Sequence, residues 1–293
     1  MADQESTGPS ENPAIVGLLV MAAVFVDFFG MLVVIASKSV ALAMLFTGAA
    51  AAQLGLIAIW AVLGPHRWFI RLPATLAVTA LLYAALAMGM VADGEAWSDV
   101  GRTLLFLPMV FLAVQLPIWT GRFLGGWRIV RGDADPELVA SGSRQFQLQD
   151  LLGATVVLAV ALGLASVGVA GEGDVGETWI PLFLFCLVGA VWSAFSTLPC
   201  LCACFVARDK GRSTAVMAAY VFGMTLVVAV VIGVFAGGGP PAELVVVFFL
   251  FHAALVGVML GVLHLLRVSG YVLHRAGRKE PTAPPPETPS ATS

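Results

Sequence analysis

Charged residues are scarce in this 293-residue chain: Asp, Glu, Lys and Arg make up 11% of it, whereas hydrophobic residues make up 59%. A soluble domain carries about 25% charged residues, because water must solvate its surface. This shortfall excludes an ordinary water-soluble domain and a disordered chain. The formal net charge of −3 also excludes a nucleic-acid partner, which would require a strongly basic surface.

Cysteine and histidine are equally scarce, with four of each. So few cysteines exclude a disulfide scaffold, and the histidines at 66, 252, 264 and 274 are too scattered for a metal site. The chain contains no HExxH, P-loop or GxSxG motif. We therefore expect no metal and no cofactor, and the pattern favours a protein that is not an enzyme.

Long apolar runs dominate what is present. A bilayer core of about 30 Å requires about 20 helical residues, and eight stretches meet that length. They are 14–36, 40–63, 73–91, 102–120, 150–170, 179–205, 213–236 and 244–266. Continuous runs favour helices over the alternating strands of a barrel. The sequence thus predicts an all-α polytopic transmembrane bundle over 14–267 with about eight spans, whose first partner is the lipid bilayer.

The charges that remain indicate an orientation. Of the 15 Lys and Arg residues, all except Lys38 and Arg102 fall in alternate connectors or after the last span. Cytoplasmic loops retain Lys and Arg, so we expect those connectors, and with eight spans both termini, to be cytoplasmic. The same rule predicts a multi-pass protein of the inner (plasma) membrane. Residues 1–13 form a polar N-terminal segment, and 268–293 form a Pro/Ser/Thr-rich disordered tail.

Small residues recur at four-residue spacing within several spans. Helices in lipid associate where small residues allow close approach, either within one chain or with other membrane proteins. The pairs are Gly48 with Ala52, Ala51 with Gly55, Gly233 with Gly237, and Gly257 with Gly261. The two halves of the chain share no pattern of Pro, Gly or polar residues, so the inverted repeat of many transporters is absent.

A few polar residues lie at membrane depth. Asp27 is the only acidic residue deep in a span, where an unpaired charge would cost several kcal/mol. His252 lies at a similar depth, so the two could form a proton or cation relay, or simply pack within the bundle. Gln53 and Gln115 complete this candidate intramembrane polar site, although amides usually bridge neighbouring helices.

Two further groups lie near the cytoplasmic side. Cys200, Cys202 and Cys204 form a candidate thiol cluster, in which 200 and 204 share one helix face; inert packing competes with a redox or lipid-modified role. Basic residues that follow two spans are candidate contacts for anionic lipid, or ordinary determinants of topology. They are Arg122, Arg128, Arg131, Arg208, Lys210 and Arg212.

Three stretches carry a resemblance. They are RQFQLQDLLGATVVLAVALGL (144–164), AQLGLIAIWAVLGPHRWFIRLP (52–73) and LLRVSGYVLHR (265–275). They resemble membrane-boundary motifs of uncharacterised planctomycete-type multi-pass integral membrane proteins and cover about a fifth of the chain. Gln149 stands where those proteins usually have Arg. The resemblance implies a membrane location and no particular activity.

Three functions are compatible with these features. The first is a non-enzymatic scaffold, assembly or sensing component of the membrane. The alternative is a small-solute or ion transporter, proton-coupled through Asp27 and His252. The third is a membrane-embedded enzyme that modifies a lipid.

Overall fold

The computed structural model describes residues 13–65, 68–92, 94, 97–132, 187, 190–206, 210–235 and 242–275. This part of the chain is mostly helical, and five of its helices are long and apolar enough to cross a membrane. The five are α1 (Pro13–Ser37), α2 (Val40–Leu63), α3 (Trp68–Ala92), α8 (Lys210–Phe235) and α9 (Ala242–Val268). They define a helical protein with the character of a multi-pass membrane protein.

Two more predicted spans have counterparts outside that group of five. Helix α4 (Trp97–Gly125) covers the predicted span 102–120, and the shorter apolar helix Ala190–Val206 covers part of 179–205. The predicted span 150–170 lies outside the described residues. The count of eight spans therefore stays a prediction.

Helices α1 and α2 pack together as a hairpin. Placed end to end they would be about twice as long as the bilayer core is thick, so the chain must reverse between them. Lys38 makes the turn with a φ of 51°. Ser39 caps α2, since its hydroxyl accepts a hydrogen bond from the backbone N–H of Leu42 at 3.4 Å. A break of only three polar residues is therefore enough to reverse the chain.

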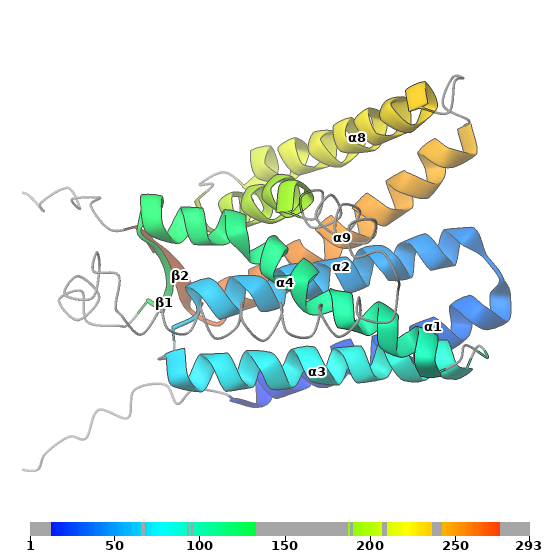
Figure 1. The fold of residues 1–293 in the computed structure, drawn as a ribbon. Coiled ribbons are helices and arrows are strands. Elements are labelled where there is room, and N and C mark those ends of the chain that lie inside the picture. Colours follow the sequence, from blue (N-terminus) through cyan, green and yellow to red (C-terminus); the bar gives the residue numbers. More distant parts are fainter. Residues whose placement is uncertain are drawn as a thin grey trace, which may run out of the picture.

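Helix α2 lies at the centre of the bundle, where it packs against α1, α3, α4 and α9 (Figure 1). Its most extensive contact is with α9, because small residues let the two backbones approach closely. Gly48 lies directly under the Phe251 carbonyl oxygen of α9, and Gly55 faces Met259. The predicted small-residue face of α2 is thus a contact face, and its Ala52 belongs to the same core cluster as Ile59 and Leu263.

The Gly257–Gly261 pair of α9 differs from the small residues of α2, because it makes no close contact with another described helix. Gly257 and Gly261 lie on the exposed side of α9, and a Cβ built on either would meet no atom within 4 Å. Within the described part of the chain this pair is therefore not a helix contact. Gly237 lies outside the described residues.

The expected all-helical fold needs one correction. Strand β1 (Trp127–Arg131) follows α4 and pairs antiparallel with β2 (Tyr271–Arg275), which follows α9 (Figure 1). Gly126 and Gly270, with φ of 60° and 87°, precede the two strands and allow the chain to leave each helix in the left-handed region. Residues 271–275 of the expected tail are thus a strand that ties the ends of α4 and α9 together. We call this end of the bundle the ribbon end.

Candidate functional site

Three arginines bind main-chain carbonyl groups at the ribbon end. Arg71 Nη1 donates to the Gly64 carbonyl at 2.9 Å, Arg122 donates to the Val62 carbonyl, and Arg267 donates to the Cys204 carbonyl. The last carbonyls of a helix lack partners within it, and the helix dipole favours a cation there. These contacts bind the C-terminal ends of α2 and of the helix Ala190–Val206 to their neighbours.

The candidate anionic-lipid residues are distributed unevenly. Arg122 also lies over the Trp119 ring at 5.5 Å, so its guanidinium contacts protein groups. Arg128 and Arg131 lie in β1 opposite His274 and Tyr271. Arg208 lies outside the described residues, as do the side chains of Lys210 and Arg212.

Two of the three cysteines of the thiol cluster lie in a π-helical turn, and Cys200 lies just before it. Cys200 is fully buried and Cys204 nearly so, whereas Cys202 is half-buried. The last turn, Cys202–Val206, is a π-helix, and its Cys204 Sγ lies 3.8 Å from the Leu260 carbonyl of α9. Among the described residues, no three His, Cys, Asp or Glu side chains lie together in a way that could hold a metal ion.

His252, on α9, contacts α8 and the helix Ala190–Val206. Its ring stacks on Trp192 at 4.8 Å, and its Nδ1 lies 2.7 Å from the Phe248 carbonyl and 3.4 Å from the Thr225 hydroxyl. The side chain is 1% exposed, and Nε2 has no hydrogen-bond partner within the described part of the chain.

Asp27 lies elsewhere, on α1. Its carboxyl group is hydrogen-bonded to the side chain of Gln53 on α2, so the Gln53 amide nitrogen donates to it. The structure therefore brings Asp27 together with Gln53, and gives His252 a separate set of partners. Gln115 is buried on α4, next to the Val114 carbonyl that accepts a hydrogen bond from Ser193 at 2.8 Å.

Helix α3 contributes a polar stripe that was not predicted from the sequence. Arg71, Thr75, Thr79 and Tyr83 follow at four-residue spacing, which places them on one helix face. Thr75 donates to the Arg71 carbonyl at 2.7 Å, whereas Thr79 Oγ1 and Tyr83 OH are buried and without a partner among the described residues. The four-residue spacing of these polar residues could have indicated the stripe. It is easily overlooked because the rest of the helix is apolar.

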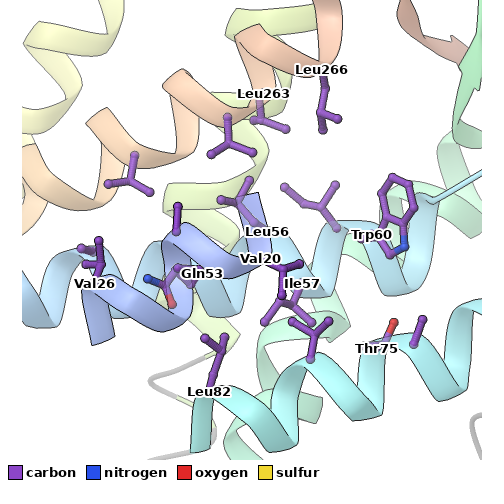
Figure 2. Close-up of a pocket in the computed structure, with 18 of the residues that line it drawn as sticks. Val20, Val26, Gln53, Leu56, Ile57, Trp60, Thr75, Leu82, Leu263 and Leu266 are labelled. Carbon is purple, nitrogen blue, oxygen red and sulfur yellow. The ribbon is translucent and has the colours of Figure 1, made fainter. Parts of the chain in front are cut away.

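A cavity of about 360 Å³ lies among α1, α2, α3 and α9 (Figure 2). Its wall is almost entirely apolar, with Val26 on α1, Leu82 on α3 and Leu263 on α9 as typical members. Gln53 and Thr75 are polar members of the wall. Ile129 of β1 also belongs to the wall, so the ribbon takes part in forming the cavity.

The cavity and the Asp27–Gln53 pair share one residue, because Gln53 belongs to both. In Figure 2 its amide lies among aliphatic side chains from the neighbouring helices. This makes the α1–α2–α3–α9 cavity, with Gln53 in its wall, the candidate functional site.

Comparison of the chain with protein-family models, with curated proteins and with solved structures finds no match.

Proposed function

We propose that this chain is a non-enzymatic multi-pass membrane protein that binds a lipid-soluble molecule and acts as a sensing component. The observation that carries the proposal is the apolar cavity of about 360 Å³ among α1, α2, α3 and α9. A cavity of that volume is large enough for a drug-sized molecule or for much of an acyl chain. Its apolar wall would hold such a molecule by burial of hydrocarbon surface.

The proposed topology has eight spans with both termini in the cytoplasm. Its support is that α2, α4, α9 and the helix Ala190–Val206 all end at the ribbon end, beside Arg71, Arg122 and Arg267. Because α4 and Ala190–Val206 both end there, an odd number of crossings must separate them, and one span over 150–170 meets that condition. The positive-inside rule then assigns the ribbon end to the cytoplasmic face of the inner membrane.

A cysteine scan tests this topology in a variant whose native cysteines are replaced by serine or alanine. Gly94→Cys, in the turn between α3 and α4, should react with a membrane-impermeant maleimide in intact cells. Ser269→Cys, at the ribbon end, should react only after the membrane is permeabilised. The reverse pattern would overturn the orientation, and reaction of both in intact cells would overturn the alternation of spans.

The second candidate function is proton-coupled transport. The observation that favours it is the set of buried polar atoms without partners on three adjoining helices: Asp27 Oδ1, Gln53 Oε1, Thr79 Oγ1 and Tyr83 OH. Such groups mark ion or proton pathways in membrane proteins. It remains second because the cavity wall beside them is apolar, which suits a hydrocarbon better than a hydrated ion.

Site-mapped photolabelling tests the binding function. A photoreactive alkane in proteoliposomes should label peptides of α2 and α9 that line the cavity. Ala74→Phe, which fills the cavity from α3, should reduce that labelling about fivefold, since the ring occupies the volume the alkyl chain needs. Ala80→Phe is the matched control, because Ala80 is another exposed alanine of α3 that lies outside the wall.

Equal labelling of both variants would contradict the binding function. The same proteoliposomes should also hold an imposed pH gradient. Rapid loss of the gradient with the wild type, but not with Asp27→Asn, would instead establish the transport function.

A further inference from the structure

We propose that the molecule bound in the cavity carries a hydroxyl group, which donates a hydrogen bond to the side-chain oxygen of Gln53 in the cavity wall. This inference rests on the proposed binding function and names the class of ligand. The class is a long-chain or polycyclic hydrocarbon with one hydroxyl group, such as a fatty or prenyl alcohol.

The first step concerns burial and partners. Gln53 is 8% exposed and Asp27 is 1% exposed, and they come from two packed helices. Their side chains are hydrogen-bonded to each other, yet Gln53 Oε1 and Asp27 Oδ1 each have no partner within the described part of the chain. Buried polar atoms are nearly always paired, so two unpaired ones on adjoining side chains require an explanation.

The second step concerns the kind of partner that is missing. The Gln53 amide nitrogen donates to Asp27, so the Gln53 atom left without a partner among the described residues is its carbonyl oxygen. An amide oxygen accepts hydrogen bonds and cannot donate one. The missing partner is therefore a donor, which excludes ketones, esters and ethers as the polar group of the ligand.

The third step concerns charge and shape. A carboxylate or phosphate head group would have to lose its hydration in a wall whose described members include no Lys, Arg or His. An ammonium group would have to lose its hydration among aliphatic side chains such as Val26 and Leu82. A neutral hydroxyl donates to the Gln53 oxygen at the smallest desolvation cost, while its hydrocarbon chain fills the rest of the cavity.

The experiment compares competitors of equal chain length against the photoreactive alkane. The probes are hexadecanol, its methyl ether and hexadecylamine, with the labelled sites mapped to the cavity peptides. Wild-type protein should bind the alcohol about tenfold more tightly than the ether, the difference expected for one buried hydrogen bond. Gln53→Met keeps the side-chain length but removes the acceptor, so it should reduce that preference to about twofold.

Gln115→Met is the matched control, since Gln115 is a buried glutamine of α4 that lies outside the cavity wall. It should keep the full preference for the alcohol. Equal binding of alcohol and ether by the wild type would overturn the hydroxyl proposal while leaving the binding function intact, and so would a preference for the amine. Failure of every probe to compete at the cavity would instead overturn the binding function itself.

A readout on the wild type alone covers the case in which Gln53→Met does not fold. A hexadecanol that carries a diazirine next to its hydroxyl group should label α2 at or beside Gln53. The matching ether should label the cavity without that preference. Equal distribution of the two labels along the cavity would overturn the proposal.

Discussion

Gly48→Ala should destabilise the protein by about 2–3 kcal/mol, even though alanine is the better helix former by about 1 kcal/mol. A Cβ at residue 48 would overlap the carbonyl oxygen of Phe251 and press on the Cβ of Ala254. Both obstacles belong to the α9 main chain or to atoms fixed on it, so no side-chain rotation relieves the clash. The two helices would have to separate along their most extensive contact. Thermal unfolding of the purified protein in detergent measures the loss.

Gly257→Ala is the control for that experiment. A Cβ on Gly257 would meet no atom within 4 Å, so only the helix-propensity gain acts, and stability should stay the same or rise by up to about 1 kcal/mol. Equal destabilisation by the two substitutions would mean that Gly257 also lies in a close contact, either with another segment or with a second protein. A neutral Gly48→Ala would contradict the α2–α9 packing.

The character of the fold was predictable from the sequence because lipid imposes a simple length requirement. Apolar runs such as 40–63 and 244–266 correspond closely to α2 (Val40–Leu63) and α9 (Ala242–Val268). The hairpin at Lys38 followed from length alone, since one bilayer cannot contain both helices end to end. These inferences depend on local composition, which the sequence displays directly.

The ribbon was not predictable in the same way. Strands β1 and β2 contain five residues each and lie far apart in the chain, so their pairing depends on where α4 and α9 end in space. The arginines of the two strands also resemble the ordinary basic residues of a cytoplasmic loop. A short strand that pairs only with a distant one leaves little periodic signal of its own.

The candidate site was predictable only in part. Asp27 and Gln53 were both identified as polar residues at membrane depth, but the one partner considered for Asp27 was His252, with simple packing as the alternative. Depth along the bilayer was the only coordinate that the sequence supplied. It does not say which helices are neighbours, and the structure places α1 against α2 and α3, and α9 against α2 and α8. The cavity depends on the same neighbour relations, so no motif indicated it.

Ile129→Ala should destabilise the protein by about 2–4 kcal/mol, the usual cost of removing a fully buried isoleucine side chain. Ile129 is 0% exposed, whereas the other four residues of β1 are only partly buried. Its side chain contributes to the cavity wall, and its main chain lies in the ribbon that links α4 to α9. Truncation should therefore loosen the ribbon end, and thermal unfolding in detergent measures the effect.

Val272→Ala tests whether the loss comes from burial or from any change in the ribbon. Val272 lies in β2 opposite Val130 and is 44% exposed, so its truncation should cost less than about 1 kcal/mol. An equal loss from both substitutions would mean that the strands present different faces from those described, because a shift of one residue in register exchanges the two sides of a strand. A small loss from Ile129→Ala alone would mean that the ribbon does not close the cavity. With the expected asymmetry, removal of the Ile129 side chain would also enlarge the cavity, and a bulkier photoreactive hydrocarbon should then label it more strongly than in the wild type.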